Sequence, residues 1–274
     1  MIDNLSFSIA NDSSVAPVGQ HNFKDQHVQK ELRRYADNLL AQYDFSLIGL
    51  KKLELELHKN PKTSLFIHAG VKLAISKAAF SLISNPLQVG IVVSVFRESH
   101  RLRPREINGL IWGTNNSESA LDPHPHGENF VVEKDRQLRW LHKVNPNIKC
   151  RLIWVDDGCD SDTGKSIQTI IDHRQLHETH EVIFLEDFIK NAPNQKIDLL
   201  REAVVELKSA KDSKKGGSVY AGMASSITAG DDIVVYTDAD LSYNLGLLGT
   251  LIHPIVNGAS AVTGNRRHEL SVSE

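Results

Sequence analysis

The sequence predicts an α/β protein, with a mostly parallel sheet flanked by helices and an amino-terminal helical extension. The prediction rests first on near-continuous apolar runs of strand length, which are typical of strands buried on both faces of a parallel sheet. It rests second on the segments of helical periodicity that separate these runs. The clearest strand is Ile233 to Tyr236, in the stretch DIVVYTDAD, which ends in Asp238 and Asp240. Ligands of open α/β sheets bind beyond the carboxyl ends of the strands, so a site is expected there.

The composition is that of an ordinary globular protein with enough apolar material for a core. Of the 274 residues, 41% are hydrophobic and 24% are charged, and the net charge of −3 favours neither nucleic acid nor acidic membranes as a partner. Cys150 and Cys159 are the only cysteines, which excludes a disulfide framework and a CxxC zinc pattern. No apolar run approaches about 18 residues, and the first residues lack a signal-peptide pattern. We therefore expect a protein of the reducing cytoplasm without a transmembrane segment.

Residues 1–86 are expected to form a tail and a helical extension. The first 20 residues are rich in Ser and Asn and indicate a flexible tail. Apolar residues then recur on one helical face in three segments that are separated by turns and Asn-Pro breaks. The expected helices span 23–43, 44–59 and 63–84. Nothing in these helices indicates chemistry.

The second domain is expected at 87–274 and begins with a strand at 89–96. This strand runs directly into the charged cluster RESHR, at the edge of the sheet where a site is expected. Residues 104–132 are irregular in pattern. Within them His124 and His126 are compatible with a metal site, although histidines between prolines in a polar loop are more often simply exposed. A helix is expected at 133–144.

A second strand, at 150–155, delivers two adjacent acids, Asp156 and Asp157, into a turn rich in Gly, Asp and Ser. Adjacent residues of an extended segment point to opposite sides, so one acid can face a ligand while the other orients the turn. A carboxylate that accepts a ring N–H is a natural way to recognise uracil or guanine. Helices at 165–175 and 197–207 and a third strand at 182–185 complete this part of the chain.

The segment KKGG, at 214–217, precedes an expected helix at 218–229 and predicts an anion site. Glycines let backbone N–H groups approach a ligand closely, and a helix N-terminus with lysines attracts anions. Neither GxxxxGK[ST] nor a GxGxxG after the first strand is present. Beyond Asp240, a helix is expected at 246–256 and a further strand at 259–263.

Asp238 and Asp240, spaced i, i+2 after a buried strand, suit a hard divalent cation that also takes phosphate oxygens. The alternative is that the two acids only cap the following helix, because Asp is common at strand-to-helix turns.

The motifs in their order resemble inverting family 2 glycosyltransferases of the GT-A type. FRES follows the first expected strand and VDDG-x-D-S-D follows the second. KKGG precedes the helix at 218–229, DADLS follows the strand after that helix, and GNRR follows the last expected strand. The last two resemble dolichyl-phosphate glucosyl- and mannosyltransferases most. The resemblance covers about residues 88–268. It implies a Rossmann-like GT-A domain, a UDP- or GDP-sugar donor, an unknown acceptor, and Mn²⁺ or Mg²⁺ as cofactor.

The resemblance also implies roles for individual residues. Asp157 would contact the base, and Asp238 and Asp240 would flank the ribose and the metal-diphosphate, with Asp240 favoured as the direct metal ligand. The residues implied for nucleotide binding are Val95, Phe96, Glu98, Asp156, Asp157, Lys215, Gly216, Gly217 and Asp238.

The catalytic base of the family lies on a segment that would follow residue 274. We therefore expect this chain to bind donor nucleotide but to transfer sugar poorly, and we expect a further domain or a partner at its C-terminus.

Two other functions are compatible with the same motifs. One is a nucleotide-sugar binding module without catalysis. The other is a sugar-phosphate nucleotidyltransferase, which is disfavoured because no glycine- and arginine-rich phosphate loop follows the first strand.

Overall fold

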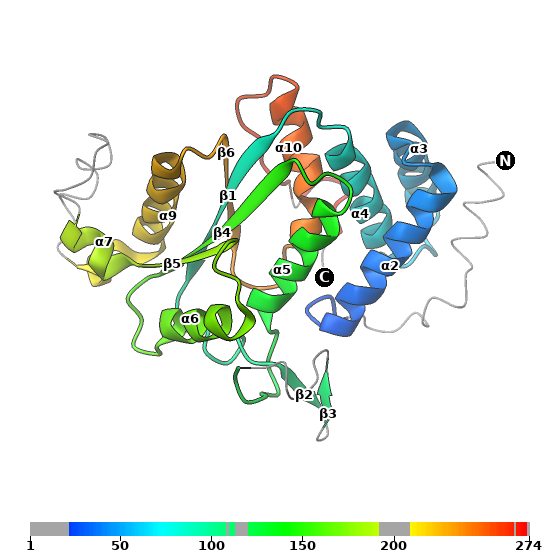
Figure 1. Ribbon diagram of the computed structural model, residues 1–274. Coiled ribbons are helices and arrows are strands. Elements are labelled where there is room, and N and C mark those ends of the chain that lie inside the picture. The colour runs from blue at the N-terminus through cyan, green and yellow to red at the C-terminus, as the bar shows by residue number, and fades with distance from the viewer. Residues whose placement is uncertain (1–21, 108–109, 113–119, 192–208, 266, 273–274) are drawn as a thin grey trace. The chain divides into compact units, whose positions relative to one another are not determined.

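The computed structural model describes residues 22–107, 110–112, 120–191, 209–265 and 267–272 (Figure 1). The expected tail at 1–20 and the expected helix at 197–207 lie outside this part of the chain. The structure divides into two compact units that are not continuous in sequence. The sheet unit comprises Asn85–Arg136 and Pro146–Tyr243; the helical unit comprises Met1–Ser84, Gln137–Asn145 and Asn244–Glu274.

The sheet unit is built on four parallel strands in the order β5-β4-β1-β6. They are β1 (Leu87–Val95), β4 (Ile148–Asp156), β5 (His180–Phe184) and β6 (Ile233–Asp238). The register pairs Ser94 of β1 with Val155 of β4 and with Asp238 of β6, so the carboxyl ends of these strands lie at one edge. The prediction of an α/β fold with a parallel sheet flanked by helices is confirmed.

Helices cover both faces of this sheet, which explains the continuous apolar runs. On one face Val92 and Val155 pack against Ala221 of α9 (Ala210–Ala229). On the other face the ring of Trp154 lies 5.7 Å from that of Phe130, at the start of α5 (Phe130–His142). Two further helices, α6 (Thr163–Arg174) and α7 (Leu185–Asn191), contact β5 (Figure 1).

The strand order creates a crevice at the carboxyl edge. The chain proceeds outward from β1 to β4 and β5, then returns across the sheet to β6 on the other side of β1. Such a reversal is the topological switch point at which open α/β sheets leave room for a ligand. The crevice therefore lies beyond the tips of β1 and β6.

The start of α9 differs from the expectation. A helix was expected at Ser218, after the KKGG segment, but α9 begins at Ala210. Its first turn is capped, since the Ser209 N–H donates to the Asp212 carboxylate at 3.1 Å and the Ala210 N–H donates to Glu186 at 2.8 Å. The expectation of a glycine-rich loop at a helix N-terminus is therefore wrong: Lys215, Gly216 and Gly217 lie inside α9.

Two other segments also differ from the expectation. The stretch at 104–132, expected to be irregular, contains an antiparallel pair, β2 (Arg105–Ile107) and β3 (Leu110–Trp112). The strand expected at 259–263 is wrong, because these residues have no regular structure and most are exposed. Their side chains are small, so pairing as a buried strand would gain little from burial of apolar surface.

The helical unit centres on α4 (Leu65–Ser81), which packs against α2 (Gln26–Tyr43), α3 (Leu47–His58) and α10 (Leu248–Val256). A short 3₁₀ helix, η3 (Leu245–Leu247), precedes α10. The three amino-terminal helices confirm the periodicity, and Asp25, Ser46 and Ser64 cap them at their N-termini. Among the described helices none is long and apolar enough to cross a bilayer.

Two glycines of α9 give a matched test of how closely this helix approaches the sheet. A Cβ at Gly222 would lie 2.3 Å from Val92 Cγ1, whereas a Cβ at Gly216 would meet nothing within 4 Å. Gly222→Ala should lower the free energy of unfolding by about 1–3 kcal/mol through overpacking. Gly216→Ala should raise it by about 0.5–1 kcal/mol through helix propensity. Urea denaturation measures both, and equal effects of the two variants would contradict the close packing of α9 on β1.

Candidate functional site

A pocket of about 840 Å³ occupies the crevice at the carboxyl edge of the sheet. Its walls come from the segments that follow β1, β4 and β6 and from the first turns of α9. Its lining residues are Ser94, Phe96, Arg97, Glu98, Arg101, Asp157, Gly158, Cys159, Asp160, Ala210, Lys211, Lys215, Asp238, Ala239 and Asp240. Five of them are acidic and four are basic, so the pocket carries many charged groups without a large excess of either charge.

The two adjacent acids after β4 take different roles. Asp156 is buried and its carboxylate accepts the N–H groups of Gly158 at 2.9 Å, Cys159 at 3.2 Å and Gly164 at 2.5 Å. These bonds tie the turn to the start of α6, so Asp156 holds the turn and does not line the pocket. Asp157 lines it, as expected for neighbours in an extended segment.

Asp157 is held in place from two sides. Its N–H donates to the Val95 carbonyl at 3.1 Å, and its carboxylate accepts the Ser213 hydroxyl at 3.3 Å. Burial raises the pKa of Asp157, and hydrogen bonds from Ser218 and Ser213 oppose the rise. Val95 itself is 1% exposed and lies behind the lining, whereas Phe96 is exposed and lines the pocket.

Both acids after β6 form ion pairs with cations of the pocket. Asp238 lies 2.5 Å from Lys215 Nζ and also accepts the Tyr236 hydroxyl at 3.2 Å. The hydrogen bond to Asp238, followed by that to Tyr236, raises the pKa of Lys215. Asp240 lies 2.9 Å from Arg101 and also accepts the Ser242 N–H at 3.2 Å. Of the expected nucleotide-binding residues in α9, Lys215 lines the pocket and Gly216 and Gly217 do not.

Arg101 lies among three carboxylates, a network that the sequence did not indicate. Its Nη1 donates to Glu98 at 2.8 Å, its Nε donates to Glu128 at 2.9 Å, and its Nη2 lies 2.9 Å from Asp240. Glu128 is buried and also accepts the Leu241 N–H at 3.1 Å. Glu128 therefore connects the segment after β1 to the segment after β6.

Lys134 of α5 is fully buried next to this network, and it too was missed. Its Nζ donates to the Tyr243 carbonyl at 3.3 Å. Burial lowers the pKa of Lys134 to about 7, an effect that Glu128 and Asp238 oppose and Arg101 reinforces. The sequence around Lys134 does not indicate that this lysine is buried, because its burial depends on tertiary packing.

The donor set allows a metal ion only together with a ligand. Among the described residues no three His, Cys, Asp or Glu side chains converge as a metal site, His124 and His126 included. Asp238 and Asp240 provide two carboxylates, whereas Mg²⁺ prefers six oxygens and usually keeps waters and substrate phosphates among them. The two acids therefore fit a cation whose other ligands come from a bound phosphate and water.

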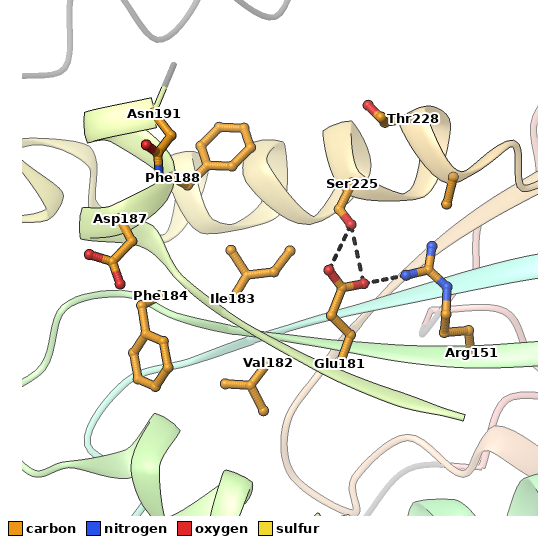
Figure 2. Close-up of a pocket in the computed structure, with 11 residues that line it drawn as sticks. Arg151, Glu181, Val182, Ile183, Phe184, Asp187, Phe188, Asn191, Ser225 and Thr228 are labelled. Carbon is orange, nitrogen blue, oxygen red and sulfur yellow. Dashed lines mark hydrogen bonds and ion pairs between the residues drawn. The ribbon is translucent and has the colours of Figure 1, made fainter. Parts of the chain in front are cut away.

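A second pocket, of about 540 Å³, lies between β5, α7 and α9 (Figure 2). Figure 2 shows the Glu181 carboxylate turned toward Arg151 and Ser225. Glu181 pairs with Arg151 and accepts the Ser225 hydroxyl at 3.1 Å, while Arg151 also lies 2.9 Å from Asp231. Apolar side chains such as Val182, Ile183 and Phe188 alternate with polar ones in its walls. None of the sequence motifs contributes to this pocket, so the crevice is the stronger candidate.

Comparisons of the chain with protein-family models, curated proteins and solved structures find no match. The case for a function therefore rests on the residues that line the crevice and on their contacts.

The buried ammonium of Lys134 predicts how stability changes with pH. In the unfolded chain a lysine titrates near pH 10.4, and in the folded chain Lys134 titrates at about 7. Between these values the unfolded state binds the extra proton, so the contribution of Lys134 to the free energy of unfolding rises with pH. Lys134→Met removes this titration. The gain in stability of the variant over the natural chain should be largest below pH 7 and should shrink by about 2 kcal/mol between pH 7 and 9.

Urea denaturation of both proteins from pH 6 to 9 measures this difference. Lys149→Met, at an exposed position of β4, controls for the loss of a surface charge. If the curves of Lys134→Met and the natural chain run parallel over this range, Lys134 is not the buried titrating group described above.

Proposed function

We propose that the chain is a metal-dependent, inverting glycosyltransferase of the GT-A type that uses a nucleotide-diphosphosugar donor. One observation carries the proposal: acids from two different strand tips, Asp157 after β4 and Asp238 with Asp240 after β6, line the same crevice together with paired cations. The strand order supports it, because β5-β4-β1-β6 corresponds to the order 3-2-1-4 of nucleotide-binding doubly wound sheets.

Asp157 suits the base of such a donor. Its carboxylate is partly buried and accepts the Ser213 hydroxyl at 3.3 Å, a weak neutral support for its charge. A ring N–H of uracil or guanine would add a donor in a site from which water is partly excluded, where such a bond is stronger than in water. The exposed ring of Phe96, on the same pocket, offers a surface on which a base can stack.

The opposite side of the crevice suits a diphosphate. Lys215 and Arg101 bring two cations to within 2.5 Å and 2.9 Å of the acids after β6. Both cations can serve phosphate oxygens, on which charge builds as the bond to the sugar breaks. A divalent ion, when bound, neutralises part of that charge as a Lewis acid, and Asp238 and Asp240 are the residues that would hold it.

A second candidate is a binding module without transfer activity. It is favoured because acids that line the pocket already form ion pairs or hydrogen bonds within the protein. Glu98 is paired with Arg101, Asp160 with Arg97, and Asp157 accepts from Ser213. An inverting transfer needs a carboxylate within hydrogen-bond reach of the acceptor hydroxyl, and each of these acids is already engaged. Donor hydrolysis and transfer assays distinguish the two candidates, since both bind the nucleotide and only the enzyme turns it over.

The metal provides the first test of the proposal. UDP or GDP should bind at least about tenfold more tightly with Mn²⁺ than in chelator, because Asp238 and Asp240 would hold an ion that offsets the charge of the diphosphate. Asp240→Asn should remove most of that difference, whereas Asp187→Asn, an acid of α7 outside the crevice, should preserve it. Calorimetry with both nucleotides measures the effect. If Mn²⁺ enhances the binding of neither nucleotide to the natural chain, Asp238 and Asp240 are capping residues and the proposal fails.

Asp157 provides the second test. Asp157→Ala should weaken binding of the preferred nucleoside diphosphate by about 1–3 kcal/mol, since a buried donor of the base loses its acceptor. Asp172→Ala, an exposed acid of α6, serves as the matched control and should bind as the natural chain does. Unchanged affinity in a folded Asp157→Ala protein would mean that the base lies elsewhere.

A further inference from the structure

We propose that Arg101 exchanges partners when an anion binds: it pairs with Asp240 in the free protein and turns that same edge of its guanidinium to a diphosphate when Asp240 is released. This rests on the proposed function for the identity of the ligand, but the exchange itself follows from the geometry of Arg101. Asp240 is then an internal competitor of the ligand.

The guanidinium is anchored by two of its three carboxylates. Glu98 accepts from Nη1 with both oxygens, at 2.8 and 3.1 Å. Glu128 accepts from Nε at 2.9 Å, and its side chain is only 9% exposed. These contacts fix the plane of the guanidinium and orient Nη2.

The contact with Asp240 is the one that can be given up. Nη2 lies 2.9 Å from one oxygen of Asp240 and donates a longer hydrogen bond, of 3.5 Å, to Glu128. The other oxygen accepts from Ser242 in the turn after β6, so Asp240 keeps a partner when Arg101 leaves. Arg101 and Asp240 both line the 840 Å³ pocket, so an anion in the pocket reaches the same edge of the guanidinium.

The balance of charge explains why the pair forms and why it can be exchanged. Three carboxylates surround the one guanidinium, and an unpaired Asp240 in this setting would be costly. A divalent ion on Asp240 and a diphosphate on Arg101 replace one neutral pair with two, so neither charge is left without a partner. Without the metal, the anion has to compete with Asp240 for Arg101.

This competition predicts an affinity change of unusual sign. With chelator present and no metal, Asp240→Asn should bind inorganic pyrophosphate about tenfold more tightly than the natural chain, because a charge-assisted donor has been freed. Arg101→Lys should have little effect in the natural background, where this edge is occupied by Asp240. In the Asp240→Asn background, Arg101→Lys should abolish most of the gain, since lysine keeps the charge but cannot hold the planar fork.

Isothermal titration calorimetry of the four proteins forms a double-mutant cycle that isolates this coupling. Asp162→Asn is the matched control, because it frees Lys165 from a mostly exposed ion pair whose residues do not line the pocket. It should leave pyrophosphate binding nearly unchanged. A tenfold gain that also appears in Asp162→Asn, or that survives Arg101→Lys, would reduce the effect to a general loss of negative charge and would overturn the proposal.

The assay is independent of the proposed function and of the folding of the arginine variants. Asp240→Asn alone decides the first step: a folded variant that binds pyrophosphate no better than the natural chain overturns the exchange. Pyrophosphate carries no base and no sugar. If UDP and GDP do not bind to the natural chain with Mn²⁺, the proposed function fails while the pyrophosphate result still stands.

Discussion

The parallel register of β1 with β4 and β6 is the constraint on which the crevice depends. Because Ser94 is paired with Val155 and with Asp238, the three strands end at the same level. The polar segment that follows each strand therefore enters the same space, beyond the last hydrogen bonds between the strands. The charged groups lie together because the strands end together, although they come from segments more than 140 residues apart in sequence.

Pairing of opposite charges is the second level of organisation. Among the described residues that line the pocket, ion pairs join Lys215 to Asp238, Arg101 to Asp240 and to Glu98, and Arg97 to Asp160. They differ in exposure: the Arg97 pair is mostly exposed and contributes little, while Arg101 and Asp240 are 28% and 20% exposed. The two pairs of Arg101, with Asp240 and Glu98, are the less exposed ones. Lys134 is fully buried next to them, and burial lowers its pKa to about 7.

Much of the sheet and part of the site could be predicted from sequence, for local reasons. Runs such as IVVSV and IVVY are apolar because helices cover both faces of the sheet. Side chains of an extended segment point alternately to opposite sides, so Asp156 holds the turn while Asp157 lines the pocket. The start of α9 was missed although Ser209 and Asp212 form a local capping box there, and Glu186, from a different helix, caps it further. Glu128 and Lys134 were missed because their importance comes from contacts with Arg101 and Tyr243, which no spacing along the chain indicates. The strand expected at 259–263 is absent, because its small side chains would gain little from burial in a sheet.

Because α9 packs closely on the sheet, this helix fixes the spacing between two sets of polar groups in the crevice. Ser213 and Lys215 are two residues apart, about 3 Å along the helix axis, and they contact acids from different strands, Asp157 and Asp238. Gly222 lets the helix pack closely against Val92. The contacts of Ser213 and Lys215 are therefore held at a fixed spacing by the same helix. The distance between the two ends of the crevice is thus set by backbone packing. A longer or shorter occupant has to be accommodated by the segments after β1, β4 and β6, which are the parts of the wall not built on α9.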